Sequence, residues 1–510
     1  MMMQKNNQEF LTFKSVSFTY DTLEKDLFKD INFTLTSGWT GIIGNNGAGK
    51  TTLLKLATAV IKPKSGYIKG PSKVFYCQQQ IEFPPNDFEA FLYSPNNDSR
   101  KLCSMLSIKD DWIYRWDTLS CGERKRFQVA IALWSLPDLL AMDEPTNHMD
   151  YESSEIVLNA LKSFTGIGLL VSHNRHLLDA LCSQCLFIES DEIIIRPGGI
   201  TQGLIQQKND FNSALSSYNI VKKEYKKIEK EIKNRKRLAE SQQKRRSKRR
   251  LAPKDHDARF KKNLARVSGK DGIGGKLLRQ LDGRFKHVKM KLELKRIKKK
   301  QKTGISSFGD NSKRDIIYYC APRILIISDS KQLKLPELVI KPSDRIGITG
   351  INGIGKSSLI RLIISEIKDA DFSFLYIPQE IEIKNATRIL ATFHESPNEV
   401  RGRVLSIINR LGSDPKKLLN ANVLSPGEIR KLILAMGMEE DPILIIMDEP
   451  TNHMDMTSIL CLEEALKETP SSLLLVSHDM VFLKSLVSTR WHIIKSNDCE
   501  GLNVLNIIYL

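Results

Sequence analysis

A glycine-rich loop of the form G-x-x-x-x-G-K-[ST] occurs twice in this chain of 510 residues, and it limits most strongly what the chain can fold into. The first copy is GNNGAGKTT at 44–52, and the second is GINGIGKSS at 350–358. A short apolar run at 40–43 precedes the first copy, and the helix-forming run LLKLATAV follows it. This order of strand, loop and helix presents backbone N–H groups and a helix N-terminus to phosphate. The sequence therefore predicts two α/β domains with one phosphate-binding site each.

The residues of the two loops are the expected contacts of a nucleoside triphosphate. Lys50 and Lys356 would reach the β- and γ-phosphates, and the hydroxyls of Thr51 and Ser357 would bind Mg²⁺. The other loop residues would also contact the nucleotide. They are Gly44, Asn45, Asn46, Gly47, Ala48, Gly49 and Thr52 in the first copy, and Gly350, Ile351, Asn352, Gly353, Ile354, Gly355 and Ser358 in the second.

Four shorter motifs follow the first loop. Gln79 ends a strand, LSCGE at 119–123 opens a helix, LLAMDEP places Asp143 and Glu144 at a strand end, and LLVSH ends at His173. An aspartate in this position can hold Mg²⁺ through water, and the next glutamate can orient or deprotonate the attacking water. A lone histidine at a strand end is usually a surface residue. Its place after the other motifs favours a contact with the γ-phosphate.

The same motifs recur about 300 to 306 residues further along the chain. They are Gln379, LSPGE at 424–428, Asp448 with Glu449, and His478. A set of motifs that repeats in order indicates an internal duplication. The predicted fold class is therefore α/β, with two tandem P-loop domains.

This set of motifs resembles the ABC ATPases, with their Walker A loop, Q-loop, signature, Walker B strand and H-switch. EPTNHMD occurs in both halves and is close to the EPTNHLD of the ABC-F subfamily of translation proteins. Two such domains on one chain, a basic linker and no apolar run of transmembrane length also resemble that subfamily.

The resemblance implies a head-to-tail sandwich of the two domains in a monomer, with two ATP molecules and Mg²⁺ at the interface. Ser425 and Gly427 would complete the first site, and Ser120 and Gly122 the second. The implied catalytic residues are Glu144, His173, Glu449 and His478, and the implied Mg²⁺ ligands are Thr51, Gln79, Asp143, Ser357, Gln379 and Asp448. Because neither site lacks these residues, both are expected to hydrolyse ATP.

Three positions depart from the pattern of the family or differ between the halves. Cys121 and Pro426 replace the first glycine of LSGGE, which is tolerable if only the serine and the second glycine touch the γ-phosphate. Tyr20 lies where an aromatic ring usually stacks on adenine, whereas the matching stretch of the second half, ILIISDS, has no aromatic residue. We therefore expect looser discrimination of the base at the second site.

A basic run between the two motif sets holds the positive excess of the whole chain. Residues 222–302 contain 33 Lys and Arg against 9 Asp and Glu, while the complete chain carries a net charge of +18. Such a run is often only a solvated helix face or a disordered tail. Its internal position and scarcity of acidic residues favour contact with a polyanion such as nucleic acid.

The linker sequence predicts a helical hairpin. Apolar residues at spacings of three and four indicate one amphipathic helix from about 206 to 250 and a second from about 276 to 302. The first seam is Leu215, Tyr218, Val221, Tyr225, Ile228 and Ile232, and the second is Leu277, Leu281, Phe285, Val288, Leu292 and Leu294. The two seams can pack antiparallel, with a tip at about 251–275. The predicted domains are 1–205, 206–305 and 306–510.

The predicted tip contains PKDHDA and SGKDG and resembles the antibiotic-resistance ABC-F proteins that protect ribosomes from lincosamides, pleuromutilins and streptogramin A. The resemblance implies binding in the ribosomal E site, with the tip near P-site tRNA and the 23S rRNA of the peptidyl-transferase centre. Only 41 residues separate Gln79 from Ser120, and 46 separate Gln379 from Ser425. This is short for a transporter's helical subdomain and for the arm that housekeeping ABC-F factors often carry.

Three alternatives stay open at this stage. A housekeeping ABC-F translation factor would use the same ATPase domains, and the ATPase of an exporter or of a DNA-repair complex would share the motifs. Scattered cysteines, a polar N-terminus and the lack of a transmembrane run predict a cytoplasmic protein without a signal peptide. Cys182 and Cys185 form a C-x-x-C without a second pair, which is weak support for a metal site.

Overall fold

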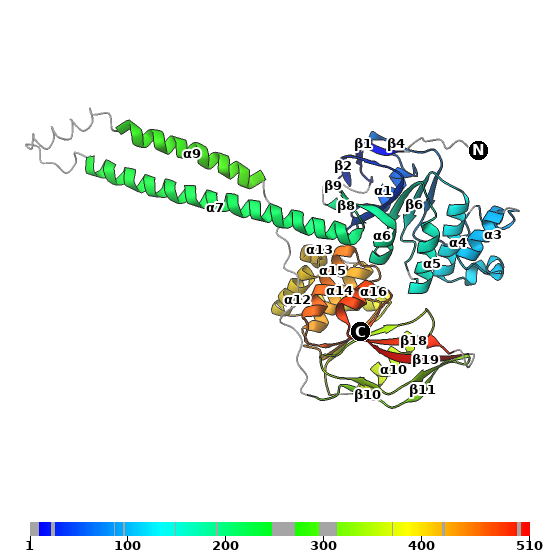
Figure 1. The fold of residues 1–510 in the computed structure, drawn as a ribbon. Coiled ribbons are helices and arrows are strands. Elements are labelled where there is room, and N and C mark those ends of the chain that lie inside the picture. The colour runs from blue at the N-terminus through cyan, green and yellow to red at the C-terminus, as the bar shows by residue number, and fades with distance from the viewer. Residues whose placement is uncertain are drawn as a thin grey trace, which may run out of the picture. The chain divides into compact units, whose positions relative to one another are not determined.

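The computed structural model describes residues 10–21, 26–85, 87–94, 97–147, 149–189, 192–246, 271–294, 314–369, 371–420, 424–496 and 501–510. The chain divides into one unit of Met1–Gly203 with Gln301–Leu510 and a second unit of Leu204–Lys300 (Figure 1). Within the first unit we call the described residues up to 203 the first half and those from 314 the second half. None of the described helices combines the length and the apolar character needed to cross a membrane.

The first half is an α/β domain whose main sheet is mostly parallel. Its described strands pair in the order β5-β6-β7-β3-β8-β9, where only β9 is antiparallel, and a smaller antiparallel sheet has the order β2-β1-β4. The strands are β1 (Leu11–Phe18), β2 (Phe28–Leu35), β3 (Gly38–Gly44), β4 (Ser65–Lys69), β5 (Val74–Cys77), β6 (Leu139–Asp143), β7 (Ile167–Val171), β8 (Cys182–Glu189) and β9 (Glu192–Pro197). The helices are α1 (Lys50–Ala57), α2 (Phe88–Leu92), α3 (Asn97–Met105), the 3₁₀ helix η1 (Asp110–Thr118), α4 (Cys121–Trp134), α5 (Tyr151–Leu161) and α6 (Arg175–Leu181).

The second half repeats the order of the six main strands, but β11 and β12 extend its main sheet. Its described strands pair in the order β11-β12-β19-β18-β14-β17-β16-β15, and β10 pairs with β13. The strands are β10 (Tyr318–Cys320), β11 (Arg323–Ser328), β12 (Lys331–Leu335), β13 (Leu338–Ile340), β14 (Arg345–Thr349), β15 (Phe374–Ile377), β16 (Leu444–Asp448), β17 (Ser472–Val476), β18 (Thr489–Lys495) and β19 (Leu502–Tyr509). The helices are α10 (Lys356–Ile367), α11 (Ile383–Glu395), α12 (Asn398–Arg410), α13 (Pro415–Asn420), α14 (Pro426–Met438), α15 (Met456–Glu468) and α16 (Met480–Leu486).

The sequence explains why the central strands are parallel and buried. Every residue of β6 (LLAMD), β7 (IGLLV), β16 (LIIMD) and β17 (SLLLV) is buried, and such continuous apolar runs are typical of strands covered on both faces. In each half the phosphate-binding loop follows a central strand, β3 or β14. The strand that ends at the Walker B aspartate, β6 or β16, is its second neighbour in the sheet, with β7 or β17 between them. Parallel strands end at the same edge, so the motifs meet there. The predicted α/β fold class with two tandem domains is confirmed.

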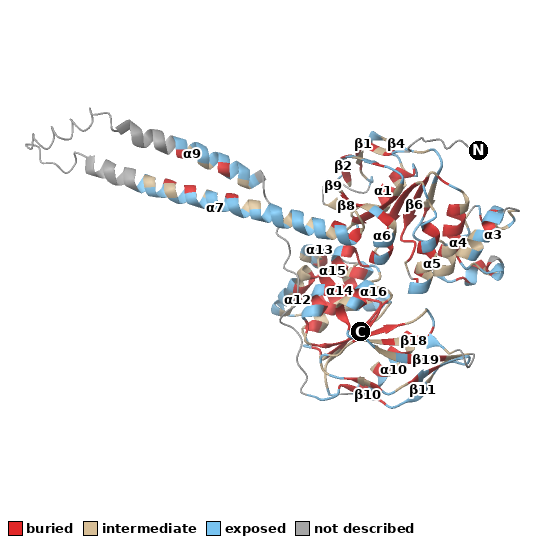
Figure 2. Cartoon of the chain, in the orientation of Figure 1, coloured by how far each residue is buried: buried red, intermediate tan, exposed pale blue. Residues whose placement is uncertain are grey.

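The second unit is a helical hairpin, as the spacing of apolar residues predicts. Helix α7 (Ile200–Arg246) and helix α9 (Asp271–Leu294) pack through a narrow apolar seam (Figure 2). The buried residues of this seam are Val221, Ile228, Ile232, Leu281 and Val288, with Tyr225, Phe285 and Leu292 half-buried beside them. The rings of Tyr225 and Phe285 lie 4.9 Å apart. The seam of the hairpin is therefore the predicted one over most of its length.

Two details of the hairpin prediction were wrong. Helix α7 begins at Ile200 rather than near 206, and α9 begins at Asp271 rather than near 276. Leu215 is 38 % exposed and Tyr218 lies outside the apolar cluster of the hairpin, which begins at Val221. Apolar spacing alone does not tell where a partner helix begins to cover the seam. Residues 251–270 of the predicted tip lie outside the described residues, and the predicted domain limits stay predictions.

Candidate nucleotide-binding sites

A cavity of about 970 Å³ lies in the first unit and is lined by residues of both halves. From the first half, the predicted site residues that line it are Tyr20, Asn45, Asn46, Gly47, Gly49, Lys50, Thr51, Thr52, Gln79, Asp143, Glu144 and His173. From the second half they are Asn352, Gly353, Gly355, Lys356, Ser357, Ser358, Gln379, Ser425, Asp448, Glu449 and His478. We call the set around Lys50 the first site and the set around Lys356 the second site.

The two phosphate-binding loops have the same internal contacts. The amine of Lys50 donates to the carbonyl of Gly44 at 2.8 Å, and the amine of Lys356 donates to the carbonyl of Gly350 at 2.8 Å. Gly49 precedes α1 with a φ of 94°, and a Cβ there would lie 2.7 Å from Cζ of Phe28. Only glycine fits this left-handed turn without strain, so the loop needs Gly49 to hold Lys50 in place.

Each site has a hydroxyl and a carboxylate in contact at the position expected for Mg²⁺. Thr51 donates to Oδ2 of Asp143 at 2.7 Å, and Ser357 donates to Oδ2 of Asp448 at 2.9 Å. Burial raises the pKa of both aspartates, against the hydrogen bonds from these hydroxyls. A bound divalent cation would offset the free-energy cost of burying the charged carboxylates. Hydroxyl and carboxylate oxygens are the ligand atoms that Mg²⁺ prefers. The residues present therefore fit Mg²⁺.

The candidate catalytic glutamate and histidine make the same contacts in both halves. Oε1 of Glu144 lies 3.3 Å from Nε2 of His173, and Oε1 of Glu449 lies 3.3 Å from Nε2 of His478. The histidine backbone N–H donates to the other glutamate oxygen at 3.3 Å in each half. Both glutamates have a φ of 50°, a conformation that costs free energy and is usually kept only at functional sites.

Burial sets the protonation of these groups. Burial, together with the charge of the preceding aspartate, raises the pKa of Glu144 and of Glu449 to about 8. Burial and the nearby lysine lower the pKa of His173 and of His478 to about 3, so both imidazoles are neutral near pH 7. A carboxyl whose pKa lies near the working pH is suited to accept a proton from water. Oε1 of both glutamates is buried and accepts no hydrogen bond within the described part of the chain.

One aspartate joins each loop to the opposite half. Asp455 accepts a hydrogen bond from the backbone N–H of Asn46 at 2.8 Å, and Asp150 accepts one from the backbone N–H of Asn352 at 3.1 Å. The sequence motifs did not assign a role to these two residues, although both end the repeated TNHMD, which could have indicated one.

The signature serines occupy matching helix ends but differ in their relation to the cavity. Ser120 caps α4 and Ser425 caps α14, each in a capping box with the glutamate three residues later. Pro426 is the first residue of α14, where proline is favourable because its missing N–H would be unpaired in any case. Ser425 lines the cavity, whereas Ser120 and Gly122 are not among its lining residues, and neither is Gly427. The pairing of each loop with the opposite signature therefore stays a prediction.

Tyr20 lines the cavity at the first site, and its hydroxyl lies 3.0 Å from Oγ1 of Thr52. On the second-half side, Ile327 lines the cavity next to Gly355, with no aromatic ring in the predicted stretch. The ring of Tyr20 is therefore the candidate for stacking on the base at the first site.

Replacing Tyr20 with alanine is expected to weaken ATP binding at the first site by about 5- to 150-fold, because stacking contributes about 1–3 kcal/mol per base. Calorimetric titration with ATP in a Lys356→Ala background, which lacks the lysine of the second site, measures the change. The control is Tyr20→Phe, which removes only the hydroxyl contact with Thr52 and should bind within about twofold of the parent. Equal weakening by both substitutions would speak against stacking.

Comparisons with known proteins agree with this arrangement. The family model described as ABC transporter matches residues 28–147 and again residues 333–452. The chain is 27% identical over 465 residues to the erythromycin resistance ATP-binding protein MsrA of Staphylococcus epidermidis, covering 89% of this chain and 91% of that protein. It is 25% identical over 515 residues to the ribosome protection protein VmlR of Bacillus subtilis (strain 168), covering 97% and 88%.

A solved structure shows the same fold. The archaeal ribosome recycling factor aABCE1, in complex with the archaeal ribosomal stalk protein aP1, superposes with a TM-score of 0.61. The match covers 96% of this chain and 89% of that chain at 15% sequence identity.

Proposed function

Because this chain belongs to the ABC-F family of ATPases, we propose that it binds ribosomes in an ATP-dependent manner and protects the peptidyl-transferase centre from antibiotics. It would act in the cytoplasm as a monomer, in the E site of the 70S ribosome, next to P-site tRNA and 23S rRNA. Two relatives support this proposal, since VmlR is named as a ribosome protection protein and MsrA as an erythromycin resistance protein.

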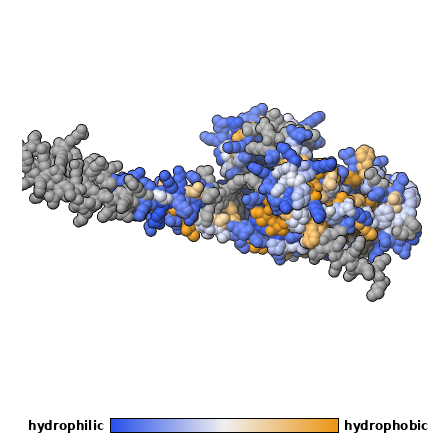
Figure 3. Space-filling view, turned by 90° about the horizontal axis from the view of Figure 1, so that it is seen from above, coloured by the Kyte–Doolittle hydropathy of each residue, from blue (hydrophilic) through white to orange (hydrophobic). Residues whose placement is uncertain are grey.

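The observation that carries the proposal is the position of the basic run in the segment that connects the two halves. Residues 222–302 hold 33 basic and 9 acidic residues. Hydrophilic side chains cover most of the described part of the hairpin in Figure 3. Helix α7 has 47 residues, which at 1.5 Å per residue extends over about 70 Å. A long basic hairpin is suited to rRNA, whose phosphates release counterions when lysine and arginine bind them.

At each site the chain's own residues would bind and orient ATP. At the first site Lys50 and the loop N–H groups would hold the phosphates, and Ser425 from the second half would close over them. Thr51, Gln79 and Asp143 would hold Mg²⁺, which neutralises charge on the phosphates. Ser357, Gln379 and Asp448 would do so at the second site. Because residues of both halves line the cavity, bound ATP would favour the closed arrangement.

Hydrolysis would then reverse this closure. Glu144 and Glu449 would orient the attacking water and accept its proton, and His173 and His478 would contact the γ-phosphate. Loss of the γ-phosphate removes the group that both halves hold. The halves would separate, and the protein would leave the ribosome.

Sedimentation with purified 70S ribosomes tests the ribosomal part of the proposal. We expect the protein to pellet with ribosomes in the presence of a non-hydrolysable ATP analogue and to stay in the supernatant with ADP. Binding should weaken as the salt concentration rises. If the protein did not bind ribosomes at moderate ionic strength with any nucleotide, the proposal would be wrong.

A drug-susceptibility test then separates resistance from a housekeeping role. Expression is expected to raise the inhibitory concentration of a lincosamide, a pleuromutilin or streptogramin A by at least about fourfold, with erythromycin in the same panel. The control is a variant with Lys50→Ala and Lys356→Ala, which should give no protection. Ribosome binding without any change in drug tolerance would instead assign the chain to the housekeeping translation factors.

A further inference from the structure

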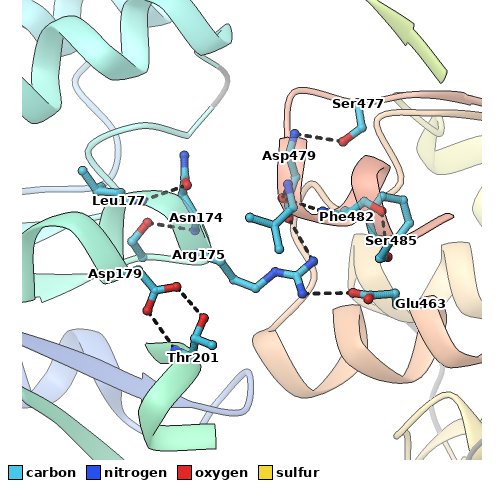
Figure 4. Close-up of polar contacts among 12 residues, drawn as sticks. Asn174, Arg175, Leu177, Asp179, Thr201, Glu463, Ser477, Asp479, Phe482 and Ser485 are labelled. Carbon is cyan, nitrogen blue, oxygen red and sulfur yellow. Dashed lines mark hydrogen bonds and ion pairs between the residues drawn. The ribbon is translucent and has the colours of Figure 1, made fainter. Parts of the chain in front are cut away.

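A buried arginine, Arg175, connects the two halves beside the second site. Arg175 is the first residue of α6, two residues after His173, and is 6% exposed. Its guanidinium donates to Oε2 of Glu463 at 2.9 Å and to Oδ2 of Asp479 at 3.5 Å. Both acceptors belong to the second half, and Figure 4 shows the guanidinium lying between them.

The position of Asp479 gives this contact a link to ATP chemistry. Asp479 directly follows His478 and caps α16, where its Oδ1 accepts from the backbone N–H groups of Val481 and Phe482 at 2.9 Å. Arg175 contacts the other oxygen of the same carboxylate. The residue next to the second-site histidine is therefore held by its own helix on one side and by the first half on the other.

Glu463 anchors the arginine from the side of α15. It is 8% exposed and also accepts a hydrogen bond from Lys467 at 3.0 Å. Burial alone would raise the pKa of Glu463, but hydrogen bonds from Ser485 and Lys467 and the nearby Arg175 lower it below its usual value. Glu463 is thus a charged partner that fixes the guanidinium next to Asp479.

The duplicated sequence shows that the residues of this ionic contact are not repeated at the matching positions of the other half. The residues of the other half that match Arg175, Glu463 and Asp479 are Met480, Leu158 and Asn174. None of the three carries a charge. Within the described part of the chain, the residue after the first-site histidine, Asn174, therefore has no ion pair equivalent to that of Asp479 with Arg175.

We propose that Arg175 is a positioning residue for the second site, because it holds Asp479, and through it His478, from the first half. The proposal deepens and rests on the proposed ATPase function. As a consequence, hydrolysis at the second site depends on the contact of Arg175 in α6 with Asp479 of the second half. Hydrolysis at the first site has no such requirement.

The test measures ATP turnover at one site at a time. Glu144→Gln leaves the second site as the active one, and Glu449→Gln leaves the first. Arg175→Met, which installs the residue of the matching position, is expected to lower kcat about tenfold in the Glu144→Gln parent and less than twofold in the Glu449→Gln parent. KM for ATP should change less than threefold in both. Equal losses in the two parents would overturn the inference.

Two further variants separate positioning from a merely structural role. Arg175→Met with Glu463→Leu replaces a buried ion pair by apolar side chains, which proteins usually tolerate well. Its unfolding temperature should return close to that of the parent while second-site turnover stays about tenfold low. Asp479→Asn keeps a capping side chain like that of Asn174 and should lower second-site turnover alone. Turnover that recovers with stability in the double variant, or a fully active Asp479→Asn variant, would contradict the inference.

The activities of the Glu144→Gln and Glu449→Gln parents separate a failure of the proposed ATPase function from a failure of this inference. If neither parent hydrolyses ATP, both the proposed ATPase function and this inference are wrong. If both parents hydrolyse ATP and Arg175→Met affects them equally, the inference alone is wrong.

Discussion

Replacing Glu144 and Glu449 together with glutamine is expected to lower ATP hydrolysis by about 10²- to 10⁴-fold and to trap the protein on ribosomes. Glutamine keeps the size of the side chain and can still accept the hydrogen bond from the histidine backbone N–H, which is 3.3 Å long in each half. It cannot accept a proton from water. ATP should therefore still close the two halves but no longer release them.

The measurement combines phosphate release with sedimentation in ATP. The double variant should pellet with ribosomes in ATP as completely as the parent does with a non-hydrolysable analogue. A control with Glu89→Gln and Glu395→Gln changes two exposed glutamates, one in each half, and should behave like the parent. A double variant that sediments free of ribosomes in ATP would show that closure and ribosome binding are not coupled.

Neutralising the most basic stretch of the linker is expected to have the second large effect. RRSKRR at 245–250 contains five basic residues, and their replacement with glutamine removes up to five phosphate contacts. Each contact adds about 0.7–0.9 to the slope of log K against log salt, so the slope should fall by up to about four. Affinity for ribosomes near 0.1 M salt should fall by about 10²- to 10³-fold.

This prediction needs a control of equal charge. Lys62, Lys69, Lys73, Lys101 and Lys109 are exposed lysines of the first half, and their replacement with glutamine changes the net charge by the same amount. If the basic stretch contacts rRNA, the control should lose less than about tenfold in affinity, and ATP turnover without ribosomes should be unchanged in both. Equal losses would mean that net charge alone attracts this protein to ribosomes.

Much of the candidate site was predictable because the motifs lie at strand ends. Glu144 and His173 are far apart in the sequence, but both follow buried strands of one parallel sheet, so the sheet brings them together. The glycine and lysine positions of the loops followed from the phosphate-binding pattern in the same way. The seam of the hairpin was predictable, because apolar residues recur at spacings of three and four along both helices and pack against each other, as Tyr225 and Phe285 do.

The ionic contact that Arg175 makes between the halves was not predictable from such patterns. Arg175 and Glu463 are 288 positions apart, and neither lies in a repeated motif. Nothing in a single sequence says which surface of α6 will face α15. The same limit explains Leu215, whose apolar character fits the seam although the cluster of α7 and α9 starts at Val221. Local periodicity reports which face of a helix is apolar, but not how far its partner extends.

The one-sided contact of Arg175 has a consequence for how such a molecule can diverge. In an assembly of two identical subunits, every substitution appears at both symmetry-related positions, so a cation placed on one edge is placed on the other as well. A single polypeptide with two copies of the module is free of that constraint. Here one edge carries Arg175, Glu463 and Asp479, while the matching positions carry Met480, Leu158 and Asn174. Fusion of the two copies thus permits the two edges to acquire separate roles.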